Sequence, residues 1–121
     1  MRVLAIVLLL CPAMLSAAPL ENKWRLQFSG NARSDGVLVL AITPNGRETA
    51  TIEIPITDGT RENRVAKNVR DALKTAIGED FKIEVDDGED VLVKRRLGRP
   101  RFNVTVVSNS IRGVRLNLDQ E

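Results

Sequence analysis

Residues 50–77 read ATIEIPITDGTRENRVAKNVRDALKTAI, and the spacing of their apolar residues changes at Asp58-Gly59-Thr60. Before this turn every second residue from Ala50 to Ile56 is Ala or Ile, which predicts a strand with one buried face. After the turn, apolar residues recur with helical spacing from Arg61 to Ile77 and occupy about 140° of arc. The stretch therefore predicts a strand, a tight turn and an amphipathic helix.

The ends of these two elements carry their own signals. Pro55 lacks a backbone donor, which places it near a strand end or on a sheet edge. Thr60 or Asp58 is expected to cap the start of the helix, because short polar side chains accept hydrogen bonds from free N–H groups there. Gly78 is expected to end the helix in a left-handed conformation.

Strand patterns flank this stretch on both sides. Upstream, apolar and charged or polar residues alternate over 23–28, and Val37 to Thr43 is almost entirely apolar, which is typical of a central strand. Asn45-Gly46 predicts a type I′ hairpin turn, and Asp87-Gly88 predicts a second tight turn. Downstream, alternating apolar residues predict strands at 81–86, 91–93, 102–106 and 114–118.

The predicted order is three strands, one helix and four strands, or βββαββββ. One amphipathic helix among several hairpins favours an α+β sandwich, with about seven short strands in a mostly antiparallel sheet and the helix packed on one face of the curved sheet. Residues 19–121 contain no long linker or low-complexity tract, so they are expected to form a single domain.

The first 18 residues have the organisation of a secretory signal peptide. Arg2 precedes an apolar run from Val3 to Leu10, Pro12 interrupts it, and Ser16-Ala17-Ala18 offers small residues for cleavage. Cleavage after Ala17 and cleavage after Ala18 are both open. The run is too short for a membrane span, which needs about 20 apolar residues. The sequence therefore predicts export to the periplasm or the medium.

The composition restricts the chemistry available to the chain. It contains no His and a single Cys, Cys11, which lies inside the predicted signal peptide. Imidazole ligands, His-based proton relays and disulfides are thus excluded from residues 19–121. We predict no catalytic residues, no cofactor and no enzymatic activity. Eighteen Lys and Arg stand against 16 Asp and Glu, so any electrostatic function depends on local clusters.

The strand, turn and helix at 51–60 and 65–73, followed by further strands at 81–93 and 102–106, resemble β-α-β modules of phage tail and bacterial surface proteins. In those modules a Thr- and Val-rich strand leads through a short turn into an Ala-rich helix. The resemblance covers about half of the chain and includes no catalytic signature. It implies a structural or assembly module and assigns no functional residues.

A basic loop lies between two of the predicted strands. Its cations are Lys94, Arg95, Arg96, Arg99 and Arg101. Arginine holds two phosphate oxygens in one planar fork, so the loop is a candidate binding site for lipopolysaccharide, extracellular nucleic acid or an acidic protein. The basic helix side at Arg64, Lys67, Arg70 and Lys74 can assist. A solvated loop that prevents edge-to-edge aggregation is the alternative.

An acidic turn precedes the basic loop. Asp86, Asp87, Glu89 and Asp90 offer oxygen ligands for calcium, although their spacing does not match an EF-hand. A tight hairpin turn with solvated carboxylates explains Asp87-Gly88 without a metal, and this interpretation is favoured.

These features favour a small exported bacterial protein that acts as a non-catalytic protein-interaction or structural module in the envelope or medium. The alternative is a polyanion-binding module that uses residues 94–101. The expected partner is another protein, or a second copy of the chain, bound through charge complementarity or an unpaired strand edge. Lys23–Phe28 and Gly113–Leu118 are the candidate edges.

Overall fold

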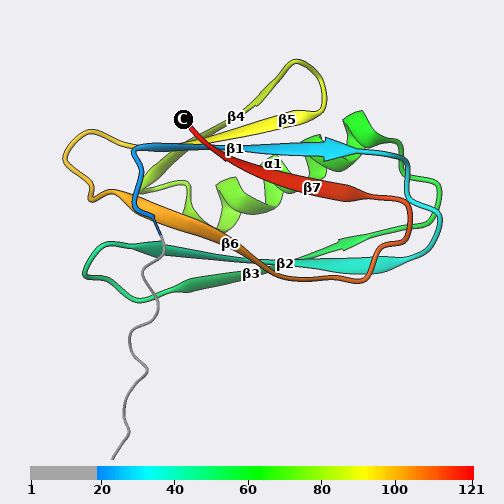
Figure 1. Ribbon diagram of the computed structural model, residues 1–121, viewed down its shortest axis with the longest axis horizontal. Helices are drawn as coiled ribbons and strands as arrows, with labels where there is room; N and C mark the ends of the chain where they lie inside the picture. Colours follow the sequence, from blue (N-terminus) through cyan, green and yellow to red (C-terminus); the bar gives the residue numbers. More distant parts are fainter. Residues whose placement is uncertain (1–18) are drawn as a thin grey trace, which may run out of the picture.

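The computed structural model describes residues 19–121, which form seven strands and one helix (Figure 1). The predicted order βββαββββ is confirmed. The signal peptide, its cleavage site and Cys11 lie outside the described residues. The elements are β1 (Lys23–Ser29), β2 (Gly36–Pro44), β3 (Ala50–Ile56), α1 (Glu62–Ile77), β4 (Phe81–Asp86), β5 (Asp90–Arg95), β6 (Phe102–Asn109) and β7 (Arg115–Gln120).

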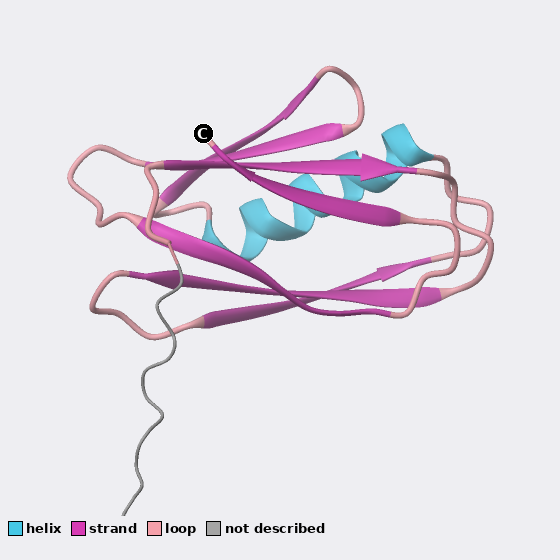
Figure 2. Cartoon of the chain, in the orientation of Figure 1, coloured by secondary structure: helices cyan, strands magenta, loops and turns pink. Residues whose placement is uncertain are grey.

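The strands divide into two antiparallel sheets. One has the order β4-β5-β1-β7 and the other the order β3-β2-β6. The predicted α+β class, with seven strands in antiparallel pairing and one helix, is confirmed. The two sheets face each other, and α1 lies between them on one side (Figure 2). Alternation identifies the buried face of a strand but not its neighbour, so this division was not predictable from the pattern.

The apolar face of α1 packs on both sheets. Val65, Ala66, Val69 and Leu73 are buried, and the helix contacts β3 of one sheet and β4, β5 and β1 of the other. Inward-facing residues of the strands complete one continuous core, including Trp24, Leu26 and Phe28 from β1 and Leu38, Leu40 and Ile42 from β2. The helix therefore closes the sandwich along the side formed by β3 and β4.

The start of α1 is capped by a distant loop rather than by its own sequence. Arg61 is the N-cap residue and makes no side-chain cap, so the expectation of Thr60 or Asp58 was wrong. Asn31 Oδ1 accepts the N–H of Glu62 at 3.1 Å, and Glu62 Oε2 accepts the N–H of Gly30 at 2.9 Å. These reciprocal bonds satisfy free donors as a capping box does, but they join segments remote in sequence.

The end of α1 also differs from expectation. Gly78 has φ of −64° and is right-handed, not left-handed. Its N–H donates to Lys74 O at 3.0 Å, and a Cβ at this position would lie 2.4 Å from that oxygen. Close approach of the backbone, rather than positive φ, is the reason for glycine here.

Residues 30–35, the hub loop, connect β1 to β2 and bind two other connections. Ala32 exchanges backbone hydrogen bonds with the β3–α1 turn, through Thr60 O and the N–H of Gly59, each at 2.8 Å. Arg33 N–H donates to Arg112 O in the β6–β7 turn at 2.8 Å. Gly30 has φ of +88°, and a Cβ there would lie 2.0 Å from a carbonyl oxygen of that turn. The hub loop thus joins both sheets and the helix start.

The opposite end of the sandwich is joined through Phe102. Its N–H and carbonyl form a bridge with Glu21, and its carbonyl also accepts the indole N–H of Trp24 at 3.0 Å. The rings of Phe102 and Phe81 pack edge to face at 4.7 Å. The two sheets are therefore fastened to each other at both ends.

The two predicted tight turns behave differently. Asp87 and Gly88 both have positive φ, 53° and 80°. Asn45-Gly46 does not form a type I′ turn, because only Gly46 has positive φ and β3 begins at Ala50. The N–H of Asn45 instead donates to Arg101 O at 2.8 Å. That bond continues the pairing of β2 with β6, and the turn itself is closed locally, because Arg47 N–H donates to Pro44 O at 3.0 Å.

The sheet positions of several strands were predictable. β2 is central, and β3 with Pro55 is an edge strand, both as expected. Of the two candidate edges, β1 pairs on both sides with β5 and β7 and is therefore not an edge. β7 pairs only with β1 and leaves one edge free.

Replacing Asn31 with Ala is expected to destabilise the fold by about 1 kcal/mol, the typical cost of losing a helix N-cap. Urea denaturation followed by circular dichroism measures the change. Asn45→Ala is the matched control, since it removes the same side chain from an exposed turn and is expected to cost less than about 0.5 kcal/mol. Equal effects of the two substitutions would contradict the capping role of Asn31.

Candidate functional site

Most cations of the basic loop bind other parts of the same chain. Lys94 Nζ lies 2.9 Å from Glu84 Oε1. Arg95 donates to Asn22 Oδ1 and to the carbonyl of Arg99, each at 2.7 Å. Lys94 and Arg95 thus belong to the end of β5 and not to a loop, and these contacts hold that end against β4 and the segment before β1.

The centre of the loop is fastened to the end of α1. Arg96 Nε donates to Gly78 O at 3.1 Å, and Arg99 Nε lies 3.0 Å from Asp80 Oδ1. A cation beside the C-terminal carbonyls of a helix is electrostatically favourable. Arg101 is exposed, and Leu97 at the tip is fully exposed. Four of the five predicted binding cations thus have structural partners within the fold.

One hollow gathers cations from three elements. Lys74 of α1, Lys82 of β4 and Arg96 of the loop line an open depression of about 570 Å³, together with Glu79. Of the helix cations expected to assist the loop, Lys74 is the one that shares this hollow with it.

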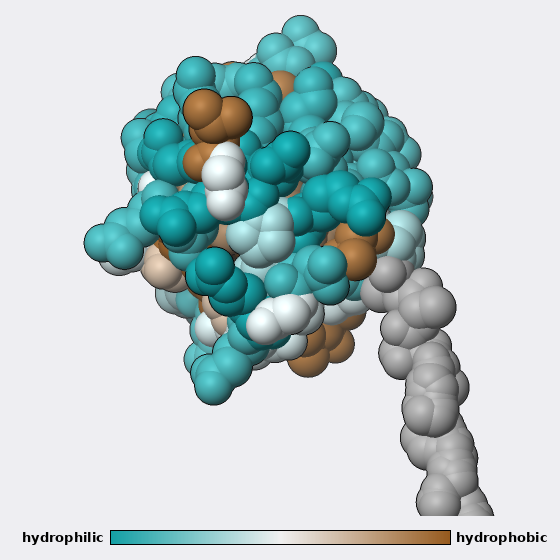
Figure 3. Space-filling view, turned by 90° about the vertical axis from the view of Figure 1, so that its left-hand side faces the viewer, coloured by the Kyte–Doolittle hydropathy of each residue, from teal (hydrophilic) through white to brown (hydrophobic). Residues whose placement is uncertain are grey.

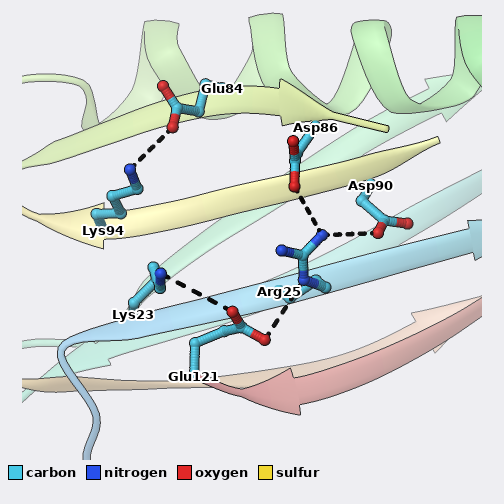
Figure 4. A network of polar contacts seen from close by, with 7 residues as sticks. All are labelled: Lys23, Arg25, Glu84, Asp86, Asp90, Lys94 and Glu121. Atoms are coloured by element: carbon cyan, nitrogen blue, oxygen red, sulfur yellow. Dashed lines mark hydrogen bonds and ion pairs between the residues drawn. The ribbon is translucent and has the colours of Figure 1, made fainter. Parts of the chain in front are cut away.

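The acidic turn is organised around a cation that the sequence analysis missed. Arg25 Nη1 lies 3.0 Å from Asp86 Oδ2 and 2.8 Å from Asp90 Oδ2 (Figure 4). The guanidinium lies between two of the four calcium candidates. Within residues 19–121, no three His, Cys, Asp or Glu residues come together in a group that could hold a metal ion. Asp87 holds the turn conformation, with φ of 53°.

The Arg25 contacts extend across the outer face of the four-stranded sheet. Arg25 Nε also lies 3.4 Å from Glu121 Oε2, and Lys23 Nζ lies 3.8 Å from Glu121 Oε1 (Figure 4). Hydrogen bonds to Asp90 and Asp86 raise the pKa of Arg25 above its usual value. Registers Arg25↔Leu92 and Arg25↔Asp119 place this residue at the centre of the face, which is therefore charged but internally paired.

A second ion pair on this face is sensitive to pH. The hydrogen bond from Lys94 lowers the pKa of Glu84 below its ordinary value. Both side chains are more than a third exposed, 35% for Lys94 and 39% for Glu84, so solvent screens the pair and limits it to below about 1 kcal/mol.

A small apolar pocket lies at the end of the molecule where the basic loop meets the β2–β3 turn. Its volume is about 140 Å³, which is enough for one apolar side chain. Ile42, Ile77 and Phe81 contribute to its apolar lining, and Arg47 and Arg99 also line it. Apolar residues are scattered among charged ones over this end of the molecule (Figure 3). The pocket is thus small and does not extend into a large apolar surface.

The sheet edges differ in how they are protected. Helix α1 packs along β3 and β4, and β3 also contains Pro55. On β6 the bridge to Glu21 occupies the beginning of the strand, and a bulge leaves Val107 without an opposite residue further along. Proline, bulges and covering elements all prevent unwanted strand pairing. Within the described residues, β7 has none of these features, and its register with β1 is regular.

Apolar side chains lie partly exposed beside this free edge. Val106 stands opposite the buried Leu40 and so faces inward, yet it is 37% exposed. Leu116 and Leu118 of β7 contact the core but are only half-buried. Val107 is 59% exposed. We call β7, with its Leu116 and Leu118, together with Val106 and Val107 of β6 the open margin. The helix closes the other side of the sandwich but not this one.

No protein-family model matches this sequence, and a comparison with curated proteins gives no significant match. The likeness of residues 51–73 to modules of phage tail and bacterial surface proteins thus remains a prediction from pattern. Within residues 19–121, no helix is both long enough and apolar enough to cross a membrane.

Replacing Glu84 with Gln is expected to lower the free energy of unfolding by about 0.5 kcal/mol at neutral pH. Because the folded pKa of Glu84 is lowered, the pair stabilises the fold above the pKa of unfolded glutamate. This contribution disappears as the pH falls through the folded value, so wild type and variant should converge in acid. Urea denaturation of wild type and variant at neutral pH and in acid measures the difference in their free energies of unfolding.

Lys94→Met provides the control for this prediction. It should cost the same at neutral pH, and the double variant should cost no more than either single one. A difference between Glu84→Gln and wild type that persists unchanged in acid would rule out the ion pair as its cause.

Proposed function

We propose that the protein is a non-catalytic interaction or assembly module, exported to the bacterial envelope or medium, whose binding site is the open margin. The observation that carries this proposal is the unprotected edge of β7 beside half-buried apolar side chains. A partner strand added there gains main-chain hydrogen bonds for affinity and side-chain contacts for specificity. It also removes apolar surface from water.

The distribution of charge supports contact rather than catalysis as the role. The carboxylates of Asp86 and Asp90 bind Arg25. The apolar pocket between the basic loop and the β2–β3 turn, at about 140 Å³, is too small for a substrate larger than a single ring. The free edge of β7 in the open margin, by contrast, has no strand partner within residues 19–121.

Removing one edge donor tests the proposal. Leu118→Pro deletes a backbone N–H, whereas Leu118→Ala shortens the side chain equally but keeps the donor. Tagged full-length protein, expressed with its leader, is used to capture proteins and copies of itself from periplasm and medium. Affinity for the partner should fall about tenfold further in the Pro variant than in the Ala variant, since one unpaired acceptor costs about 1–3 kcal/mol.

Thermal unfolding of both variants controls for general damage. The proposal is wrong if the Pro and Ala variants retain every captured partner equally while both remain folded.

A second candidate function is polyanion binding. The hollow lined by Lys74, Lys82 and Arg96 favours it, because cations from three elements can meet one phosphate-rich ligand there. We therefore propose the hollow beside the basic loop as the polyanion site; Arg95 and Arg99 are less suited, because their guanidinium groups bind Asn22 and Asp80.

The salt dependence of heparin binding tests this alternative. Replacing Lys74, Lys82 and Arg96 with Ala should make the dependence of affinity on salt shallower, because fewer counterions are released. The control removes three cations elsewhere, as Arg47→Ala, Arg61→Ala and Arg112→Ala together. Identical slopes for the two triple variants would exclude a specific site in the hollow.

A further inference from the structure

One hydrogen bond between β7 and β1 shows in which direction the backbone groups of β7 point. Glu121 N–H donates to Lys23 O at 3.1 Å across the ladder with β1. Backbone groups alternate between the two sides of a strand, so Arg115, Asn117 and Asp119 also bond toward β1. Phe28 N–H donates to Glu89 O on the β5 side, which agrees with this assignment for β1. The N–H and C=O groups of Leu116 and Leu118 therefore point to the free edge.

The sequence of this edge is self-complementary. β7 reads Arg-Leu-Asn-Leu-Asp from 115 to 119. When two copies of the strand are placed antiparallel about Asn117, Arg115 of each stands opposite Asp119 of the other. Leu116 then stands opposite Leu118, and these are the residues whose backbone groups face outward. Only this kind of register satisfies both charge and hydrogen bonding at once.

In this register the pairing between the two β7 strands ends at Val114. Val114, the next residue with groups on the free side, already accepts a hydrogen bond from Asn109 Nδ2 at 3.0 Å. Pairing is therefore confined to the strand itself. On the inner face, Leu116 and Leu118 of the two copies would cover each other, which is where they are now half-exposed.

We propose that a second copy of the chain binds at the open margin, by antiparallel pairing of β7 with β7 about Asn117, which joins the two four-stranded sheets into one continuous sheet. The proposal rests on the proposed function and specifies its partner. Opposite charges directly across a strand pair stabilise it, and like charges destabilise it. The two copies are related by a two-fold axis through Asn117, so the contact between Arg115 of one copy and Asp119 of the other occurs twice.

A cysteine placed on the axis tests the register. In a Cys11→Ser background, Asn117→Cys provides the only thiol of the chain, whether or not the leader is removed. Residues directly opposite in a non-hydrogen-bonded pair have Cα atoms about 4.5 Å apart, which suits a disulfide. Mild oxidation should convert this variant to a covalent dimer. Gln27→Cys is the matched control, because Gln27 lies beside Asn117 on β1, outside the proposed pairing, and its two copies would be about 14 Å apart across the joined sheet.

Charge reversal tests the partner. Arg115→Asp and Asp119→Arg each place like charges opposite one another, so each variant alone should be monomeric in sedimentation up to millimolar concentration. An equimolar mixture of the two should form a heterodimer, since both cross-strand pairs are then opposite in charge. Misfolding cannot produce this rescue. Arg112→Asp, with the same change in net charge outside β7, should dimerise as wild type does.

Wild-type protein that stays monomeric over this range, or equal cross-linking at positions 117 and 27, would overturn the proposal. That result leaves the proposed function standing if a different protein is still captured and is lost in Leu118→Pro but not in Leu118→Ala. If the wild type is monomeric and no captured protein is lost in Leu118→Pro, both the dimer and the proposed function are wrong.

Discussion

The fold depends on the hub loop, residues 30–35, which satisfies backbone groups of two other connections and of the helix start. Asp35 Oδ1 accepts the N–H of Asp58 at 2.8 Å, and Ser34 Oγ accepts the N–H of Arg112 at 3.0 Å. These bonds hold the β3–α1 and β6–β7 connections against the same loop, and so they constrain how the two sheets and α1 meet.

The sequence predicted where the strands and the helix lie, but it did not predict which distant groups they contact. Periodicity located every strand and the helix, because the apolar face of each element follows from its own residues. The cap by Asn31 and the position of β1 inside its sheet depend on groups far away in the chain. Local signals could not supply them. Asp87-Gly88 behaved as expected because its turn is closed by its own hairpin.

The same distinction applies to the candidate sites. Clusters of charge were easy to recognise at 86–90 and 94–101, but the sequence did not show which charges neutralise each other. Arg25, remote from both, binds Asp86 and Asp90, and Asp80 and Glu84 bind cations of the basic loop. Most of the loop's charge therefore organises the fold. Arg96 of the loop lines an open hollow together with Lys74 and Lys82. The spacing of these three residues in the sequence does not predict that they lie together.

The open margin follows from an imbalance in the architecture. Two facing sheets leave two long sides, and residues 19–121 contain one helix, which closes the side of β3 and β4. On the other side, β6 is protected at its beginning by Glu21 and later by the bulge at Val107. A solitary domain would be expected to protect β7 as well, with lysine, proline or a bulge, because an unpaired regular edge invites association. Instead β7 keeps leucines facing inward and charges of opposite sign at its two ends, which is the composition of a strand suited to pairing.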